Sequence, residues 1–176
     1  MSRTVTETTG EQNDFFACLV QDHARIEARL EALERAAAAV SSSENEAAAL
    51  GVIAGTLDFF STEGAVHEAH EEFTLFPRLQ SLPAFKQILS ALRFQHEMNA
   101  AEGKALAACV DGFATARAHE LRRLVHRFAE MNRGHAVAEE RALFPLAAST
   151  LPPQVVAEMG RELRQRIGAV GQTATP

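Results

Sequence analysis

The same eleven-residue pattern occurs twice in this chain, at residues 67–77 (HEAHEEFTLFP) and 135–145 (HAVAEERALFP). Both copies begin with His, place Glu-Glu at the fifth and sixth positions and end in Leu-Phe-Pro. Two residues four places apart lie on nearly the same face of an α-helix, because four residues turn through about 400°. The repeat therefore predicts two helices that each project one His–Glu pair. One pair is His67 with Glu71, and the other is His135 with Glu139.

Apolar side chains recur every three or four residues along four long segments, a spacing typical of helices that bury one face. Three of the four expected helices span about residues 14–40, 84–110 and 115–147, and the second runs from a cap at Ser43 to about residue 79. Pro152 and Pro153 open a shorter fifth helix that ends near Gly168. Short loops between long helices favour antiparallel neighbours. We therefore expect an all-α fold, an antiparallel up-down-up-down four-helix bundle with an additional short C-terminal helix.

The chain is expected to divide into a flexible N-terminal tail, a four-helix domain and a C-terminal helix with its tail, at residues 1–12, 13–147 and 148–176. Asn13 or Asp14 is the expected N-cap of the first helix, because both side chains can accept a hydrogen bond from a free backbone N–H. Ser43, followed three residues later by Glu46, resembles a capping box that opens the second helix.

The charge and composition exclude several classes of function. The 176-residue chain carries a formal net charge of -6, whereas a nucleic-acid surface needs an excess of Lys and Arg. The first twelve residues, MSRTVTETTGEQ, lack the apolar core of a signal peptide, and no apolar run approaches the ~18 residues of a membrane span. Cys18 and Cys109 form no CxxC motif. We expect a soluble cytoplasmic protein with no nucleic-acid and no membrane partner.

Each of the four long helices places one histidine on its otherwise apolar face, and these are His23, His67, His96 and His135. With the two glutamates of the repeat, six polar or charged groups would be buried near one another. Such burial costs several kcal/mol per ion unless the groups compensate one another. Shared coordination of metal ions removes that cost. The sequence therefore favours metal binding over a purely structural polar core.

The two halves of the bundle contribute equivalent sets of side chains, which are His23, His67 and Glu71 from the first two helices and His96, His135 and Glu139 from the next two. This symmetry predicts two metal ions beside a pseudo-twofold axis, each held by two histidines, with both glutamates bridging. Imidazole together with carboxylate suits iron or manganese. An octahedral ion with these ligands would keep an open position for a small ligand.

The repeated H-x3-E-E-x2-L-F-P string, with a histidine on the buried face of the first and third helices, resembles the hemerythrin family, specifically the hemerythrin-like HHE cation-binding domains. The resemblance covers about residues 14–147. It implies two non-haem iron ions in a di-iron centre with an oxo or hydroxo bridge, for which manganese or zinc could substitute. It also implies reactivity toward dioxygen, nitric oxide or peroxide. The metal ligands that it implies are His23, His67, Glu71, His96, His135 and Glu139.

The chain departs from the oxygen-carrying members of that family. Those proteins have a second histidine one turn after the third-helix histidine, where this sequence has Ala100. They use H-x4-D on the fourth helix, where His135 is here followed by Glu139 and Glu140. The implied set of four histidines and two glutamates is more similar to hemerythrin-like di-iron proteins linked to the repair of stressed iron–sulfur clusters. Those proteins often carry an additional N-terminal domain with a cysteine motif, and the 176 residues of this sequence contain no such motif.

Three further side chains stay open as ligands, namely Glu68, His70 and Glu140. Glu72 is expected beside the bridging glutamates or at the surface. His119 and His126 fall on the far side of their helix from the ligands and are expected to face solvent. Glu27 is left outside the ligand set, because the matching position on the third helix is Ala100.

Two further expectations concern the architecture. Ferritin-like di-iron bundles use E-x2-H, and none of the seven histidines has Glu three residues before it, which disfavours that architecture. The two Leu-Phe-Pro segments are expected to wall one end of the site and to terminate their helices.

Three classes of function remain open. The first is a binding module that senses, scavenges or stores dioxygen, nitric oxide or iron. The second is an enzyme that reduces peroxide or nitric oxide with an unidentified electron donor, or that supplies iron for the repair of iron–sulfur clusters. The third is a structural bundle that merely retained buried polar residues. We expect a non-haem di-iron protein that acts on O2, NO or peroxide in sensing, scavenging or a stress response.

Overall fold

The computed structural model describes residues 14–40 and 45–173, and these residues form helices and no strand. The long α-helices are α2 (Asp14–Ala39), α3 (Glu46–Phe59), α6 (Lys86–Asp111), α7 (Ala118–Ala138) and α9 (Pro153–Thr173). The shorter α-helices are α4 (Ala65–His70), α5 (Phe76–Leu79) and α8 (Phe144–Thr150). Two single 3-10 turns, η3 (Pro83–Phe85) and η4 (Thr115–Arg117), precede α6 and α7.

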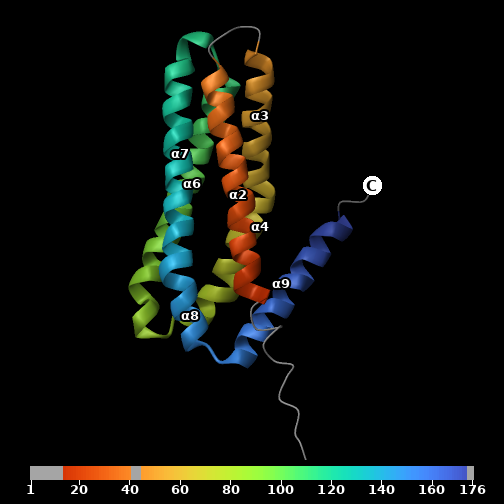
Figure 1. Cartoon of the computed structure of the whole chain (residues 1–176), viewed down its shortest axis with the longest axis vertical. Helices are drawn as coiled ribbons and strands as arrows, with labels where there is room; N and C mark the ends of the chain where they lie inside the picture. Colours follow the sequence, from red (N-terminus) through yellow and green to blue (C-terminus); the bar gives the residue numbers. More distant parts are fainter. Residues whose placement is uncertain (1–13, 41–44, 174–176) are drawn as a thin grey trace, which may run out of the picture.

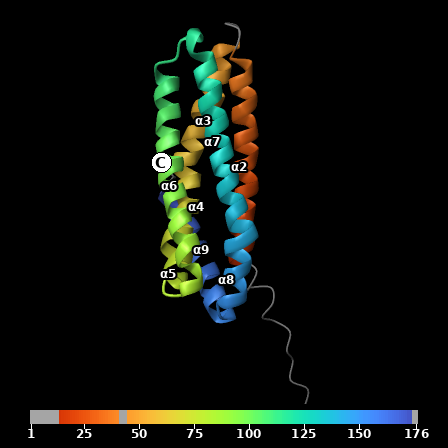
Figure 2. The ribbon, with the colours of Figure 1, turned by 90° about the vertical axis from the view of Figure 1, so that its left-hand side faces the viewer.

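Four long rods run side by side in alternating directions and form the predicted four-helix bundle (Figures 1 and 2). The first rod is α2, the second joins α3, α4 and α5, the third is α6, and the fourth joins α7 and α8. Close packing joins α2 to α3, α6 to α7 and α2 to α7, whereas α3 and α6 pack less closely. The predicted fold class is confirmed.

Three π-turns interrupt the second and fourth rods, at η1 (Phe60–Gly64), η2 (Glu71–Leu75) and η5 (Glu139–Leu143). In η2 and η5 the backbone N–H after the turn bonds to the carbonyl five residues back, from Phe76 to Glu71 and from Phe144 to Glu139. Each of these two turns is followed directly by a proline-containing helix. Because proline cannot donate a backbone hydrogen bond and crowds the preceding turn, a widened turn lets the helix pass through it.

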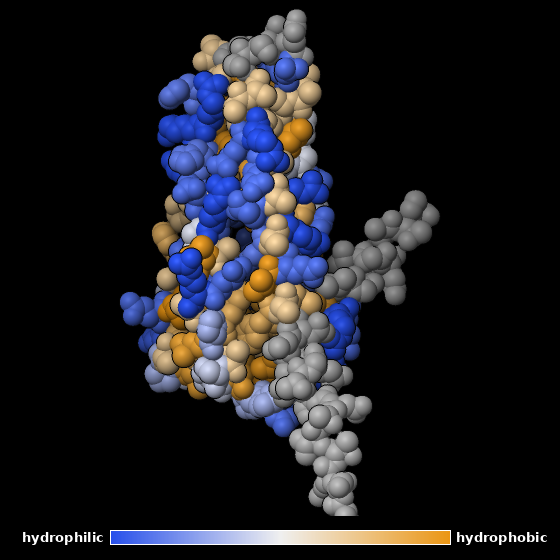
Figure 3. Space-filling view, in the orientation of Figure 1, coloured by the Kyte–Doolittle hydropathy of each residue, from blue (hydrophilic) through white to orange (hydrophobic). Residues whose placement is uncertain are grey.

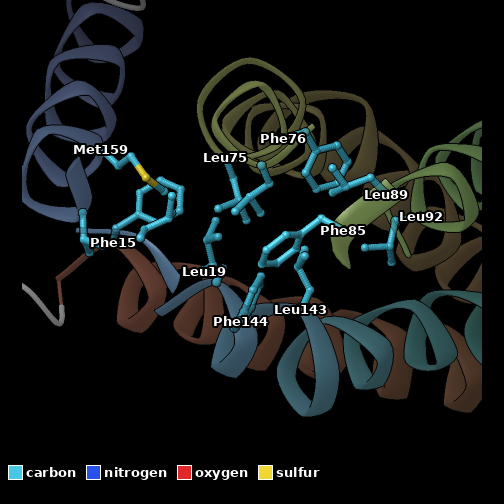
Figure 4. Close-up of a cluster of buried hydrophobic side chains, with 14 of the residues drawn as sticks. Phe15, Leu19, Leu75, Phe76, Phe85, Leu89, Leu92, Leu143, Phe144 and Met159 are labelled. Carbon is cyan, nitrogen blue, oxygen red and sulfur yellow. The ribbon is translucent and has the colours of Figure 1, made fainter. Parts of the chain in front are cut away.

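Two apolar clusters fill the interior and leave a polar layer between them. The cluster shown in Figure 4 lies at the end of the bundle where α5, α8 and α9 meet, and it includes Phe15, Phe76, Phe85 and Phe144. The other cluster occupies the opposite end and includes Leu30, Leu33, Leu106 and Phe128. The buried histidines and glutamates of the sequence repeat lie between these clusters along each rod. The fold therefore places the polar side chains in a layer sealed at both ends by hydrocarbon.

The C-terminal helix α9 is longer than predicted and ends at Thr173 rather than near Gly168. Its buried residues Val156, Met159 and Leu163 pack into the cluster of Figure 4, together with Phe15 of α2. This packing explains why the helix persists after the bundle ends, since an amphipathic helix is stabilised mainly by burying its apolar face.

The predicted helix caps are only partly visible. Asn13 and Ser43 lie outside the described residues, and Asp14 is the first described residue of α2. Asn45 directly precedes α3 and makes no side-chain hydrogen bond to it. The predicted N-terminal tail, residues 1–12, also lies outside the described part of the chain.

The surface over α2 and α7 is largely hydrophilic toward the α3 end of the bundle, and apolar side chains gather toward the end that carries α8 (Figure 3). In the described part of the chain, none of the helices is long and apolar enough to cross a lipid bilayer.

Candidate metal centre

The structure brings all six side chains predicted from the repeat and the buried histidines into one layer. The four histidines are between 4% and 7% exposed, and Glu71 and Glu139 are fully buried. Two groups form whose nitrogen and oxygen atoms lie within 4.8 Å of one another, the first His23, His67, Glu71 and Glu139, the second Glu71, His96, His135 and Glu139. Both glutamates belong to both groups, which is consistent with a dinuclear metal site.

Glu71 faces one histidine from each half of the bundle. Its Oε1 atom lies 3.3 Å from Nε2 of His67, one turn earlier on the same rod. Its Oε2 atom lies 3.3 Å from Nε2 of His96 on α6. The two oxygens of one carboxylate therefore point into different groups, which is the arrangement that a bridging ligand requires.

Glu139 repeats this arrangement from the opposite rod. Its Oε1 lies 3.3 Å from Nε2 of His135, and its Oε2 lies 3.2 Å from Nε2 of His23. All four carboxylate oxygens of Glu71 and Glu139 are buried and accept no hydrogen bond of good geometry from the described residues, although histidine nitrogens lie 3.2 to 3.3 Å away. Two carboxylates in such a position are costly unless cations compensate them. Their chemistry and their unsatisfied oxygens fit two metal ions.

The histidines also approach one another in pairs. Nε2 of His23 lies 3.1 Å from Nε2 of His67, and Nε2 of His96 lies 3.1 Å from Nε2 of His135. Two nitrogens that bind one ion at right angles, each about 2.1 Å from it, are about 3.0 Å apart. The spacing within each pair fits two ligands of a single ion.

In the half formed by α2 and α4, the outward nitrogens of both histidines face carboxylates. Nδ1 of His23 lies 2.8 Å from Oε1 of Glu140. Nδ1 of His67 lies 3.4 Å from Oδ2 of Asp22. The other carboxylate oxygen of Asp22, Oδ1, accepts a 2.6 Å hydrogen bond from Arg25. An Nδ1–H that donates to a carboxylate fixes the ring orientation and leaves Nε2 free to bind a metal.

In the half formed by α6 and α7, the two histidines have unlike partners. Nδ1 of His96 lies 3.1 Å from Oε1 of Glu72, and Glu72 also accepts a 3.1 Å hydrogen bond from Arg93. Nδ1 of His135 lies 3.0 Å from the side-chain amide oxygen of Gln95. Three of the four histidines are thus held by carboxylates and one by a neutral amide.

The buried charges strongly shift the pKa values of the centre. Burial alone would lower the pKa of His67, but the carboxylates of Glu71 and Asp22 outweigh it and raise that pKa to about 10. Burial likewise opposes protonation of His135, and Glu139 and Glu71 raise its pKa to about 9. Burial would raise the pKa of Glu71, yet His67 and the other histidines hold it well below the usual value. Protonated histidines therefore neutralise the carboxylates in the metal-free chain, and a metal ion would displace their protons.

The Leu-Phe-Pro segments wall the end of the centre, as expected. Phe76 stacks on the ring of His96, with centroids 6.0 Å apart and planes at 7°. Phe144 stacks on the ring of His23, with centroids 5.8 Å apart and planes at 10°. The second rod ends at Leu79, as expected, and the fourth continues through Pro145 to Thr150, somewhat beyond the expected end near residue 147.

The other candidate residues fall into distinct surroundings. Glu72 and Glu140 face the outward nitrogens of histidines and belong to neither metal-binding group. His70 and Glu68 also lie outside both groups, although His70 is only 1% exposed. His119 and His126 are exposed, as predicted. Glu27, which the sequence left outside the ligand set, pairs with Arg133.

Sequence reasoning did not identify Asp22 and Gln95 as part of the centre. Each directly precedes the histidine of its own helix, yet it supports the histidine of the neighbouring rod. The only signal in the sequence is a polar side chain next to a buried histidine at matching places in the first and third helices.

Residues 14–147, the described bundle with all six side chains of the centre, match the family model described as the Hemerythrin HHE cation binding domain. No curated protein matches the chain.

Proposed function

Because the chain belongs to the hemerythrin HHE cation-binding family, we propose that its buried centre holds two non-haem iron ions and binds or reacts with dioxygen, nitric oxide or peroxide. The role that this chemistry serves best is sensing, scavenging or a stress response. The observation that carries the proposal is the pair of groups that share Glu71 and Glu139.

In this proposal each ion has its own pair of histidine ligands, and the two glutamates are shared. His23 and His67 would hold one ion and His96 and His135 the other, each through Nε2, with Glu71 and Glu139 across both. When bound, iron would supply redox chemistry and a position for a small ligand, since imidazole and carboxylate ligands suit this metal. The shared carboxylates would balance the positive charge of the pair.

The rest of the bundle would control what reaches the centre. The apolar clusters at both ends exclude bulk water, and the stacked rings of Phe76 and Phe144 cover two of the histidines. The chain contains no Tyr and no Trp, so the side chains that most readily carry a stable radical are absent. We therefore expect the chemistry to stay at the centre rather than to spread through the protein.

The first test is the metal content and optical spectrum of protein purified from iron-replete cells. We expect about two iron ions per chain in the parent protein and clearly fewer in the His67→Ala and His135→Ala variants, each of which removes a ligand from one half of the centre. His126→Ala is the matched control, because His126 is exposed on the same helix as His135, and it should keep its iron. Near-zero iron in the parent protein, with an unchanged melting temperature in both ligand variants, would reject a metal centre of any kind.

The second test separates binding from catalysis. The reduced protein is mixed anaerobically with O2, NO or peroxide in a stopped-flow spectrometer. A reversible spectral change supports a binding or sensing role. Several turnovers in the presence of a reductant support a peroxide or nitric oxide reductase instead. If none of the three molecules changes the iron spectrum, the small-ligand proposal is wrong and iron handling becomes the better explanation.

A further inference from the structure

A cavity of about 360 Å³ opens on the side of the bundle where α3 and α4 face α6. Its walls are mostly apolar, and its polar residues include Glu68, Asn99 and Asn132. The same three residues, with Phe60, also line a small void of about 20 Å³ that reaches His67 and His135. The cavity therefore lies next to the candidate metal centre, separated from the small void by the side chains that line both.

The matching side of the bundle, between α2 and α7, is closed by ion pairs. Arg133 donates hydrogen bonds of 2.9 to 3.1 Å to Glu27 and of 2.8 and 3.1 Å to Glu34. These side chains span the two helices beside the histidines. The two sides of the bundle are related by the same pseudo-twofold symmetry as the histidines, so their residues can be compared position by position.

The matching positions on the open side are all small. Arg133 and Ala65 each lie two residues before a ligand histidine, and Glu27 and Glu34 correspond to Ala100 and Ala107 in their distance from His23 and His96. All three alanines line the cavity. Gly103 also lines it, at the position that corresponds to the buried Leu30. The cavity is therefore the consequence of a consistent set of small residues rather than of one packing defect.

One polar atom beside the cavity has no partner in the described part of the chain. Asn99 is 4% exposed, and its Oδ1 atom is buried without a hydrogen bond. Such an atom costs free energy unless something donates to it. Glu68 lines the same cavity and carries a second acceptor. Asn99 and Glu68 thus place two side chains that carry hydrogen-bond acceptors in the wall of the cavity.

We propose that this cavity binds a small, mostly apolar organic molecule that carries a hydroxyl group, with the hydroxyl donating to Asn99 Oδ1 and the apolar body lying along Phe60, Ala100, Gly103 and Phe128. The volume supports an organic molecule, because a cavity of about 150 Å³ already holds benzene. A diatomic gas would need far less space. The binding itself does not require metal, but the placement of the hydroxyl beside the ions rests on the proposed function.

The first test uses 1-naphthol, a fluorescent aromatic alcohol of suitable size. The chain contains no Tyr and no Trp, so the emission of the probe can be followed without interference from the protein. We expect saturable binding that is at least tenfold weaker in Ala107→Leu, which fills the cavity. Ala105→Leu is the matched control, since Ala105 is exposed on the same helix and should bind as the parent does. No saturable binding, or equal binding by the two variants, would overturn the proposal.

The second test examines the hydroxyl group. Naphthalene, which lacks it, should bind about tenfold more weakly than 1-naphthol, as expected for the loss of one buried hydrogen bond. In Asn99→Ala this difference should shrink to less than about threefold, because the acceptor is gone. An undiminished preference for 1-naphthol in Asn99→Ala would exclude the assigned orientation.

The third test separates this proposal from the function of the centre. The protein is loaded with Mn²⁺ or, as a diamagnetic control, with Zn²⁺, and the proton resonances of 1-naphthol are recorded. Broadening with Mn²⁺ but not with Zn²⁺ places the probe beside the centre. Sharp resonances in Mn²⁺-loaded protein that binds the probe would reject that placement. If the chain takes up no metal yet binds 1-naphthol with the expected effects of Ala107→Leu and Asn99→Ala, the cavity proposal stands and the metal function fails.

Discussion

The two halves of the candidate metal centre contain equivalent histidine and glutamate side chains but hold them differently. Between α2 and α4 both histidines face carboxylates, whereas between α6 and α7 one of them, His135, faces the neutral amide of Gln95. A carboxylate that accepts the outer N–H makes an imidazole a stronger donor to metal than an amide does. The position that differs is Asp22 in one half and Gln95 in the other, each just before a ligand histidine. A nearly twofold scaffold can therefore create two unequal metal sites by changing one residue.

The largest expected effect comes from removing what the halves share. In Glu71→Ala the metal content should fall from about two ions per chain to less than one, because this carboxylate belongs to both groups. His67→Ala should mainly affect the half to which His67 belongs. Metal analysis after dialysis measures both. Glu97→Gln, at an exposed glutamate beside His96, is the control and should keep its metal, and a Glu71→Ala protein with both ions would show that the halves are independent.

Exchanging the unequal residues should erase or reverse the difference between the halves. Asp22→Asn should weaken the tighter site by about 10-fold to 100-fold, the usual effect of losing a hydrogen-bonded support of a ligand histidine. Gln95→Glu should strengthen the weaker site. Competition titrations with a chromophoric chelator and Mn²⁺ would give the two stepwise affinities. If neither variant changes the ratio of these affinities, the supports do not set the inequality.

The metal-free protein should respond to pH through the same histidines. The pKa values of His67 and His135 are raised to about 10 and about 9, above their ordinary value. The two protonated histidines therefore add their full contribution to the free energy of unfolding below about pH 6.5. That contribution is lost as the pH rises through 9 to 10. Melting temperatures of the EDTA-treated protein should fall over that range and those of the metal-loaded protein much less. In Asp22→Asn the NMR titration of His67 should move toward that of His135, and an unmoved titration would refute the assigned role of Asp22.

The smallest effect is expected at the ion pairs that close one side of the bundle. Arg133→Met should lower the free energy of unfolding by about 1 kcal/mol, because partly exposed ion pairs contribute little each and several are lost together. The metal content should not change. Chemical denaturation measures the first, with Arg35→Met as a control for an isolated, exposed pair. A loss of metal in Arg133→Met would show that this closure also holds the centre in place.

The sequence predicted the rods and the six polar side chains because both leave periodic signals. Apolar residues every three or four places identify a helix, and a doubled His–Glu pair at a spacing of four identifies a shared layer. The same periodicity did not reveal the π-turns, because each shifts the apolar pattern by a single residue, which spacings of three and four already accommodate. It also underestimated the length of α9, which ends at Thr173 rather than near Gly168.

The unequal supports and the cavity were not predictable for a different reason. Asp22 acts on a histidine of another rod, so its role depends on how two helices lie side by side. Ala100 was recognised as a departure from the oxygen carriers, but its effect on shape appears only together with Ala65 and Ala107 from two different rods. No single position in the sequence shows that several small residues on different helices will together leave a cavity.

The π-turns at Glu71 and Glu139 also have a consequence for helical phase. A turn with one extra residue rotates every later side chain by about 100° relative to those before it. The segment that carries the candidate ligands and the segment that packs into the cluster of Figure 4 therefore need not share one phase. Glu71 and Glu139 are each the first residue of such a turn, where the two phases meet. The end of the bundle can thus be repacked in evolution without turning the carboxylates away from one another.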